Sequence, residues 1–395
     1  MKKPLIVQKF GGTSVGSIER IHQVAKHIID AKNAGNRVVV VVSAMSGETN
    51  RLLDLAQQID SVPNARELDV LLASGEQASM ALLAITLNKM GYSARSLTGG
   101  QANILTNGQH NDATIVNIDT TAIDQLLAQD QIVIVAGFQG ITAGGDITTL
   151  GRGGSDTTAV ALAGALKADE CQIFTDVDGV YTCDPRIVDD AQKLMVIDFP
   201  SMEKMARFGA KVLHLPSVEY AWKNQVPLRV LSTFDINQGS LVKGEECHLP
   251  ICGLAIQRDM CLIKIEQESL VAIEEQCQLF GIDIWDVIEH PEWLGLVVKS
   301  DAYSKLEMVL QGKVADRNTI SLLTAVGADA ESLAHTAHQL LIDNQIVTTH
   351  LRLDEQSFTI ALSVEQVNCA ANILHQTYIK PIEAVDCLQK HVFSG

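Results

Sequence analysis

The stretch Arg37-Val-Val-Val-Val-Val-Ser43 places five consecutive valines ahead of a serine. A strand that is apolar on both faces lies inside a sheet covered on both sides, as the strands of parallel sheets do. Parallel strands need crossover connections, and the helix-like residues 18–29 and 68–90 can supply them. This stretch therefore predicts a parallel α/β sheet with helices packed on its faces.

Other apolar runs are typical of buried strands in the same sheet, namely residues 5–10, 131–137, 171–176 and 227–232. The first of them runs into a glycine loop and an amphipathic segment at residues 17–34, which predicts strand, loop and helix. Loops rich in Gly, Ser, Thr or Asp follow the strands, at residues 11–14, 43–49, 137–142 and 175–181. Because ligands bind beyond the carboxyl ends of parallel strands, we expect these loops to converge on a site.

The segment Thr148-Thr-Leu-Gly-Arg-Gly-Gly-Ser-Asp-Thr-Thr-Ala159 is the strongest candidate for a catalytic centre. It completes a run with seven glycines between Gly137 and Gly154, and Ser155 is a preferred residue for capping the helix that follows. Free amides at a helix start can hold an anion, and Arg152 adds a forked cation beside them. An ordinary glycine turn before an ordinary helix is the alternative interpretation.

The chain changes character after about residue 243, where the glycine loops stop and shorter strand-like and helix-like runs alternate. The order strand, helix, strand, strand, helix is expected twice, at residues 252–265, 270–280, 282–289, 294–299 and 303–311, and again at residues 319–326, 330–343, 346–353, 357–364 and 366–378. We therefore expect a first domain at residues 1–243 and two copies of a small α+β unit at residues 250–395.

Composition limits the classes of function. The 395 residues carry 47% hydrophobic and 19% charged side chains and a formal charge of −17, with no compensating basic cluster. No nucleic-acid or membrane partner is expected, because no basic surface or sufficiently long apolar run is visible. The eight cysteines lack a CxxC pair and metal-ligand spacing, which favours reduced structural thiols in a cytoplasmic protein.

Charged residues with loop context form a set that suits a phosphorylated substrate. They are Lys9, Glu76, Arg152, Asp156, Asp176, Arg186 and Lys211. Lysine neutralises phosphate as a point charge and arginine as a fork, although any one of these residues alone could be a solvated surface charge. Neither GxxxxGK[ST] nor GxGxxG is present, which disfavours a P-loop enzyme and a Rossmann dehydrogenase.

Five motifs together resemble those of aspartate kinases, in order and at fitting spacing. They are Lys9-Phe-Gly-Gly-Thr-Ser14, Val42-Ser-Ala-Met-Ser-Gly-Glu-Thr49, Ser74-Gly-Glu-Gln77, Gly151-Arg-Gly-Gly-Ser-Asp-Thr157 and Phe174-Thr-Asp-Val-Asp-Gly-Val-Tyr-Thr-Cys-Asp-Pro-Arg186. The resemblance implies the amino-acid kinase fold, a parallel-rich sheet between helical layers, followed by tandem ACT-like domains. It also implies phosphorylation of L-aspartate by ATP to 4-phospho-L-aspartate, the first step towards lysine, threonine and methionine.

The same resemblance assigns roles to individual residues. It implies that Lys9 and Lys211 neutralise the transferring phosphate and that Asp156 orients the lysines. Substrate contacts are implied for Ser43, Thr49, Glu76, Arg152 and Ser155, with Arg152 on the α-carboxylate and Glu76 on the α-ammonium. Nucleotide contacts are implied for Lys9, Gly11, Gly12, Thr13, Ser14, Thr175, Asp176, Tyr181, Arg186, Lys211 and Val212. Mg²⁺ is expected to be held through ATP oxygens and water, without metal ligands from the chain.

The C-terminal part departs from the family at the loops that commonly contact an amino-acid effector. Residues 265–270 lack Pro and Gly, and residues 326–332 keep one glycine, so inhibition by lysine or threonine is expected to be weak or to depend on the loop at residues 327–332 alone. A homodimer formed by residues from about 250 onward is expected. His110, His214 and His290 are interpreted as structural. A kinase for glutamate, acetylglutamate or carbamate and an inactive effector-binding subunit are the alternative functions.

Overall fold

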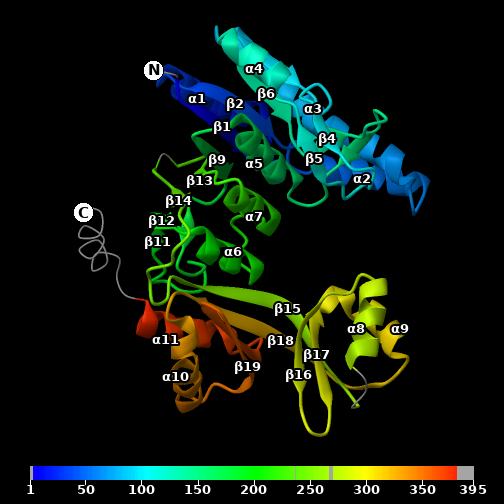
Figure 1. Cartoon of the computed structure of the whole chain (residues 1–395), viewed down its shortest axis with the longest axis vertical. Helices are drawn as coiled ribbons and strands as arrows, with labels where there is room; N and C mark the ends of the chain where they lie inside the picture. Colours follow the sequence, from blue (N-terminus) through cyan, green and yellow to red (C-terminus); the bar gives the residue numbers. More distant parts are fainter. Residues whose placement is uncertain (1–2, 236, 267–269, 380–395) are drawn as a thin grey trace. The chain divides into compact units, whose positions relative to one another are not determined.

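The computed structural model describes residues 3–235, 237–266 and 270–379, and the chain forms two compact units (Figure 1). The first unit contains Met1–Val180, Leu194–Met202 and Val212–Glu245. The second contains Tyr181–Lys193, Glu203–Lys211 and Glu246–Gly395. The division of domains near residue 243 remains a prediction, since two segments before that residue pack with the C-terminal part.

The first unit is built on an eight-stranded sheet in the order β12-β14-β13-β9-β1-β2-β6-β3. Its strands are β1 (Leu5–Phe10), β2 (Arg37–Val42), β3 (Ala94–Leu97), β6 (Ile132–Ala136), β9 (Glu170–Thr175), β12 (Val196–Ile197), β13 (Leu228–Ser232) and β14 (Ser240–Val242). Neighbouring strands are parallel except at the β13–β14 pair. The parallel sheet predicted from the valine run is therefore confirmed, and β2 lies inside it between β1 and β6.

Helices cover both faces of this sheet. The helices α1 (Ile18–Asn33) and α3 (Ala65–Lys89) pack with Val38, Val40 and Val42, so they lie on one face. Alternate valines point to the opposite face, where α5 (Gly154–Leu166) contacts β1, β2 and β9. Nine of the thirteen residues of α5 are buried, which is the pattern of a central helix.

The helix α3 is long and apolar enough to cross a membrane by length and composition, and it is the one such helix among the described residues. Its Leu72, Leu83 and Leu87 are buried, and the last two of these belong to the core under the sheet. The same apolar surface that satisfies a membrane criterion is thus used here for packing in the first unit.

A second, smaller sheet in the first unit has the order β5-β4-β7-β8. Its strands are β4 (Ile104–Thr106), β5 (Ile115–Ile118), β7 (Gln139–Ile141) and β8 (Ile147–Thr149). The remaining elements before residue 246 are α2 (Glu48–Ile59), α4 (Thr121–Ala128), β10 (Val180–Tyr181), β11 (Lys193–Leu194), α6 (Phe199–Arg207) and α7 (Leu215–Lys223). The β7–β8 hairpin matters for function because it delivers the chain from β6 to the start of α5.

The second unit contains one six-stranded sheet in the order β16-β17-β15-β18-β20-β19. The first half consists of β15 (Gly253–Ile265), α8 (Leu270–Leu279), β16 (Ile284–Glu289), β17 (Leu294–Lys299), the 3-10 turn η1 (Ser300–Ala302) and α9 (Tyr303–Leu310). The second half consists of β18 (Val314–Val326), α10 (Ala330–Asp343), β19 (Thr348–Asp354), β20 (Ser357–Ser363) and α11 (Val367–Tyr378). The predicted order strand, helix, strand, strand, helix is confirmed in both halves.

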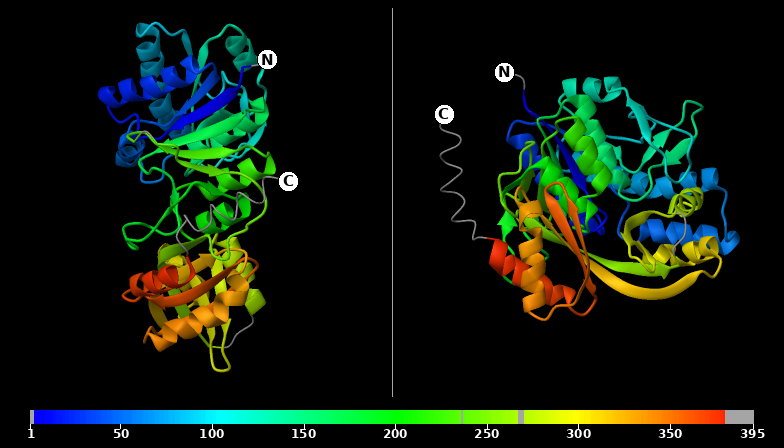
Figure 2. Two further views of the ribbon diagram at one scale, coloured as in Figure 1. Left: turned by 90° about the vertical axis from the view of Figure 1, so that its left-hand side faces the viewer. Right: turned by 60° about the horizontal axis from the view of Figure 1, so that its bottom comes forward.

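The two halves meet where β15 and β18 pair antiparallel along most of their length. The helices α8 and α9 pack on the first half, and α10 and α11 (orange and red in Figure 2) pack on the second. Because Leu262 and Leu322 alternate with residues under these helices, they belong to the opposite face, in a separate apolar cluster with Trp285 and Trp293. The helices therefore all cover one face of the sheet.

The segment Tyr181–Lys193 contributes directly to the core of the second unit. Cys183 and Val188 are buried there with residues of α10, α11 and β20. The backbone of Thr182 accepts a hydrogen bond from the Leu254 N–H at 2.7 Å. A segment that the sequence places in the first domain is thus held by the packing of the C-terminal sheet.

Candidate active site

Three of the four loops predicted to converge, those after β1, β2 and β6, lie together at the carboxyl ends of strands that are neighbours in the sheet. A Cβ atom on Gly12 would come within 2.9 Å of the Ala44 carbonyl oxygen, so the loops after β1 and β2 touch. A Cβ atom on Gly137 would lie 2.8 Å from the Ser155 Oγ, so the residue after β6 touches the start of α5. Glycine is required at both contacts because any side chain would separate the loops.

Lys9 and Asp156 form a buried ion pair at the centre of this region. The Lys9 Nζ lies 2.6 Å from the Asp156 Oδ1, and their side chains are 11% and 10% exposed. Gly11 lies next to the ammonium, since a Cβ atom there would be in van der Waals contact with the Lys9 Nζ at 3.4 Å. A buried charge needs a partner, and Asp156 on α5 fixes the position of a cation carried by the central strand β1.

The helix α5 begins two residues earlier than a cap at Ser155 would require. Its N-cap is Gly153, which has a φ of 76°, while Ser155 lies inside the first turn and packs against Gly137. The prediction that Ser155 caps this helix is therefore wrong, because a glycine in the left-handed conformation starts the helix without a side-chain hydrogen bond. The amide of Ser155 has no backbone acceptor among the described residues and stays available to an anion.

Arg152 is exposed just before this helix start. Its guanidinium has no ion-pair or hydrogen-bond partner among the described residues. Gly151 and Gly153 on either side have φ values of 70° and 76°. An arginine with a free fork, between two residues in the left-handed region, is suited to bind a carboxylate or a phosphate from solution.

The loop after β1 contains the predicted nucleotide contacts Gly11, Gly12, Thr13 and Ser14. Within the described residues, the N–H groups of Gly12 and Thr13 donate to no backbone carbonyl, whereas that of Gly11 donates to Phe174. Ser14 is fully buried, and its hydroxyl lies 2.6 Å from that of Thr233. The backbone of this loop can therefore meet a phosphate, while the Ser14 side chain holds the loop in place.

Glu76 is a buried carboxylate on α3, with an exposed fraction of 3%. Its Oε1 accepts a hydrogen bond from the Ala44 N–H at 2.9 Å, and its Oε2 is buried without a partner among the residues that the structure describes. Burial raises the pKa of Glu76 to about 7. The raised pKa reflects a buried carboxylate without a neighbouring cation, and the ammonium group of a ligand would supply that cation.

The two remaining predicted substrate contacts lie after β2. Ser43 is half-buried and its N–H donates to the Phe10 carbonyl at 3.1 Å, which ties the loop after β2 to the end of β1. Thr49 is half-buried in the first turn of α2, whose N-cap is Gly47. Ser43 thus lies in the strand-end loop, as predicted, whereas the expected loop at residues 43–49 ends earlier and Thr49 belongs to α2.

Comparison with known proteins relates this site to a family. The sequence profile described as "Amino acid kinase family" matches residues 4–232, more than half of the chain. The chain belongs to the amino acid kinase family. An aspartate kinase of Pseudomonas putida is 56% identical over 265 residues, which are 66% of this chain and 64% of that protein. An aspartokinase of Geobacillus stearothermophilus is 53% identical over 277 residues, which are 69% of this chain and 67% of that protein.

Solved structures agree with the fold of the whole chain. Escherichia coli aspartokinase III, solved with aspartate and ADP in the R-state and with lysine and aspartate in the T-state, superposes with a TM-score of 0.78 and 24% identity. The match covers 95% of this chain and all of that one. In sequence, however, this family member spans a little under two thirds of the length of the P. putida relative. The fold is therefore shared over a longer stretch than the close sequence similarity.

The other predicted nucleotide contacts of this family member are divided between the two units. Thr175 ends β9, and its hydroxyl donates to the exposed Asp176 at 3.0 Å. Val212 belongs to the first unit, whereas Tyr181, Arg186 and the exposed Lys211 belong to the second. Arg186 is 87% exposed and forms a two-pronged ion pair with Asp184, at 3.0 and 2.7 Å. A phosphate would have to compete with this carboxylate for the guanidinium.

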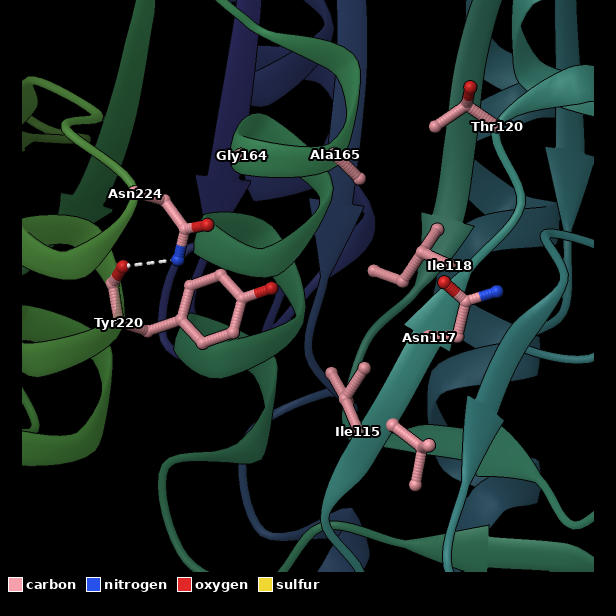
Figure 3. A pocket seen from close by; sticks show the side chains of 9 residues that line it. Ile115, Asn117, Ile118, Thr120, Gly164, Ala165, Tyr220 and Asn224 are labelled. Carbon is pink, nitrogen blue, oxygen red and sulfur yellow. Dashed lines mark hydrogen bonds between the residues drawn. The ribbon is translucent and has the colours of Figure 1, made fainter.

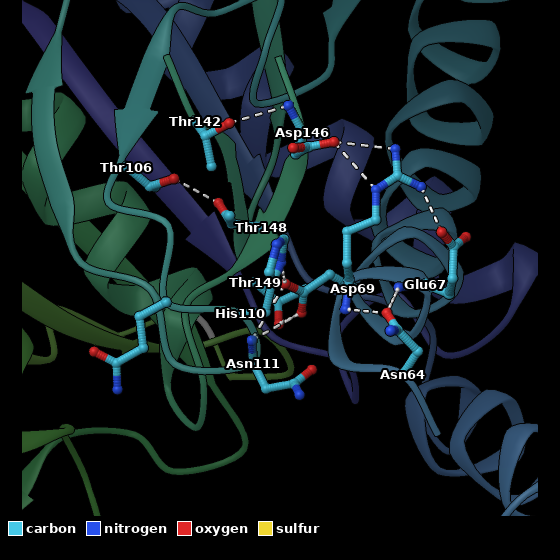
Figure 4. A network of polar contacts seen from close by, with 12 residues as sticks. Asn64, Glu67, Asp69, Thr106, His110, Asn111, Thr142, Asp146, Thr148 and Thr149 are labelled. Carbon is cyan, nitrogen blue, oxygen red and sulfur yellow. Dashed lines mark hydrogen bonds and ion pairs between the residues drawn. The ribbon is translucent and has the colours of Figure 1, made fainter. Parts of the chain in front are cut away.

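The sequence did not predict a buried polar network around Asp69 (Figure 4). Asp69 on α3 is fully buried and accepts hydrogen bonds from the side chains of His110 and Thr149. His110 had been interpreted as structural, without a partner. The sequence does contain a signal for Asp69. This acidic residue lies at helical spacing from the apolar Leu72 and from a second acid, Glu76, so it belongs to the side of the helix that is expected to be buried.

A groove of about 280 Å³ lies away from these residues, between β5, the end of α5 and α7 (Figure 3). Neutral polar groups of Asn117, Tyr220 and Asn224 line it, and burial raises the pKa of Tyr220. At 1.5 Å per residue, Gly164 is about 12 Å along α5 from Asp156. Across the described ranges, no cluster of three or more His, Cys, Asp or Glu residues is suited to a metal ion.

Proposed function

We propose that the chain is an aspartate kinase, which transfers the γ-phosphoryl group of ATP to the side-chain carboxylate of L-aspartate. The product would be 4-phospho-L-aspartate, on the route to lysine, threonine and methionine. The identity of 56% to an aspartate kinase supports the reaction class. The observation that carries the proposal is the buried Glu76 carboxylate, whose Oε2 has no partner within the described ranges, in the same unit as Lys9 and Arg152.

The proposed selection of an amino acid depends on two opposite charges. Glu76 would bind the α-ammonium group, which supplies the cation that its buried Oε2 lacks. Arg152 would bind the α-carboxylate with its free fork, as arginine does wherever two parallel hydrogen bonds to a carboxylate are needed. Ser43, Thr49 and Ser155 would add hydroxyl contacts. The side-chain carboxylate of aspartate would then be left to face the nucleotide.

The chemistry requires charge stabilisation more than proton transfer. A carboxylate nucleophile is already ionised at neutral pH, so no general base is needed. The barrier comes from bringing an anion to a polyphosphate, and fixed cations lower it when they are placed before the reaction starts. Lys9, held at 2.6 Å by Asp156, is such a preorganised cation. Lys211 is proposed as the second one.

Within the first unit, ATP contacts are proposed for the N–H groups after β1 and for Thr175, Asp176 and Val212. For Tyr181 and Arg186, which belong to the second unit, nucleotide contacts are proposed from the family resemblance alone. Mg²⁺ usually accompanies phosphoryl transfer and neutralises charge on the nucleotide. The described residues present no cage of carboxylates for it, so its ligands would be ATP oxygens and water, and no step is assigned to protein ligands of the ion. The chain's own contribution is therefore the positioning of both reactants.

The activity is tested by trapping the acyl phosphate as its hydroxamate with purified protein, ATP and Mg²⁺. We expect turnover with L-aspartate, and Arg152→Lys should raise the KM for aspartate because a point charge cannot replace a fork. Turnover with glutamate, acetylglutamate or carbamate in place of aspartate would favour another activity of the same family. Folded protein that turns over none of them would favour a regulatory subunit.

We further propose that the second unit is a pair of ACT-like domains that forms a homodimer. Of the two loops expected to contact an effector, residues 267–269 of the first lie outside the described residues. In the second, the N–H groups of residues 327–329 donate to backbone carbonyls of Gln356, Leu249 and Pro250. A Cβ atom on Gly327 would lie 2.2 Å from the Pro250 oxygen, so packing alone requires this glycine. Weak inhibition by lysine or threonine is therefore expected.

A further inference from the structure

The Asp69 carboxylate is buried completely and is fully hydrogen-bonded (Figure 4). It accepts from the His110 Nδ1 at 2.6 Å and from the Thr149 hydroxyl at 2.5 Å. The Asn111 N–H donates to its two oxygens at 3.1 and 3.2 Å. Moving a carboxylate out of water costs several kcal/mol unless such bonds replace the water. All of the donors come from outside α3, so this carboxylate joins other segments to the helix.

The donors belong to two segments far apart in the sequence. His110 and Asn111 lie between β4 and β5, whereas Thr149 is the last residue of β8. The same two segments also touch directly, because the Ala113 N–H donates to the Thr149 carbonyl at 2.8 Å. Asp69 therefore attaches both segments to α3 at one point.

The end of β8 leads within three residues to Arg152. A Cβ atom on Gly151 would lie 2.7 Å from the Asp112 Oδ1, so the loop held by Asp69 also packs against the residue before this arginine. Gly151 and Gly153 give the backbone around Arg152 many accessible conformations in the absence of such contacts. If this backbone freedom were lost only on binding, the loss would reduce affinity. An arginine that makes two parallel hydrogen bonds to a ligand therefore binds more tightly when its backbone is already fixed.

Asp69 and Glu76 are seven residues apart on α3, which is about two helical turns, so they lie on the same side of the helix. Glu76 is the proposed partner of the substrate ammonium group. One side of α3 thus contacts the proposed ammonium site directly and contacts the proposed carboxylate site through Thr149.

We propose that Asp69 is a positioning residue for Arg152, acting through Thr149 and the His110 loop, and that it thereby sets the affinity for the substrate carboxylate. The inference rests on the proposed function, since it takes Arg152 to bind aspartate. The proposal predicts that the two substrates are affected differently. Loss of the network should weaken binding of aspartate, because the arginine is no longer held, and should leave binding of ATP unchanged.

The test compares two adjacent threonines at the end of β8. Thr149→Val removes the hydroxyl bound to Asp69, whereas Thr148→Val removes an equally buried hydroxyl, 2.5 Å from that of Thr106, without touching Asp69. We expect Thr149→Val to raise the KM for aspartate about tenfold, the scale of one hydrogen bond to a charged group, with the KM for ATP unchanged. Thr149→Ser should restore the KM, because serine keeps the donor.

Asp69→Asn should raise the KM for aspartate further, but it can also impair folding. The comparison of Thr149→Val with Thr148→Val is therefore the decisive test. Equal changes in the KM for aspartate in Thr148→Val and Thr149→Val would overturn the positioning role and leave the aspartate kinase activity standing. A parallel rise in the KM for ATP would also overturn it, since that is the mark of a general structural effect. Wild-type protein without aspartate-dependent turnover would overturn both proposals.

Discussion

Glu76→Gln tests the electrostatic reasoning about the substrate site in the ligand-free protein. Burial raises the pKa of Glu76 from 4.5 to about 7, which means that the folded state disfavours the ionised form by about 3 kcal/mol. Because the folded pKa is higher than the unfolded one, the folded state binds more protons between these values. Wild-type stability should therefore fall as pH rises through this window, and the loss should be complete above about pH 7.5.

The glutamine variant cannot ionise, so it lacks this contribution while keeping the acceptor for the Ala44 N–H. We expect the free energy of unfolding of the variant, relative to wild type, to increase by about 3 kcal/mol between pH 4.5 and pH 8. This difference is measured by urea unfolding at several pH values, followed by a signal that reports on the first unit. Glu67→Gln, an exposed residue of the same helix, is the matched control and should show no such trend. A Glu76→Gln difference that does not vary with pH would refute the reasoning.

The same carboxylate should make aspartate binding depend on pH. An ammonium group beside Glu76 favours the ionised form, so binding below pH 7 must release a proton. The KM for aspartate should then rise about tenfold per pH unit below the pKa of about 7, whereas the KM of Glu76→Gln should be higher and nearly independent of pH. A wild-type KM that stays constant from pH 8 to pH 5.5 would contradict this assignment of Glu76.

Four other outcomes can be measured. Lys9→Met leaves Asp156 buried without a cation and should lower stability by about 3–5 kcal/mol, while adding Asp156→Asn should restore the melting temperature but not turnover. Burial lowers the pKa of His375 below its usual 6.5, so its contribution to stability is present above that pH and is lost as pH falls; His375→Gln should flatten this dependence in urea unfolding. Light scattering should find a dimer at micromolar concentration, and a monomer would contradict the proposed assembly. Dose-response assays should find weak inhibition by lysine and threonine, and strong inhibition would contradict the proposal about the effector loops.

Long, strongly patterned elements could be predicted from the sequence. The strands β1, β2, β6 and β9 are apolar runs of five or six residues, and all of them were expected. The strands β4, β5, β7 and β8 have only three or four residues and were missed. Such short segments carry too little pattern of their own, because they are stabilised by pairing with partners that the fold brings together.

The start of α5 shows a second limit. Serine is the better cap by local preference, but Gly154 packs so closely that a Cβ atom would meet Leu150 and Phe138 at 2.9 Å. Tertiary contact therefore favours a helix that starts at Gly154, with Gly153 as its N-cap. The Asp69 network was out of reach for a similar reason, since its members are separated by 41 and 80 residues in the sequence. Only the unusual position of two acids on one side of α3 gave a signal.

Those two acids show how a structure distinguishes a binding carboxylate from a positioning one. Both are almost completely buried on the same helix, so burial alone does not separate them. Both oxygens of Asp69 are occupied by protein donors, which leaves no place for a ligand and makes its role internal. Glu76 has one oxygen bound by a protein donor and one that no described residue contacts with a hydrogen bond, and burial raises its pKa. A ligand with an ammonium group can donate to the second oxygen of Glu76. The fully hydrogen-bonded carboxylate of Asp69 can instead hold neighbouring segments in a fixed position.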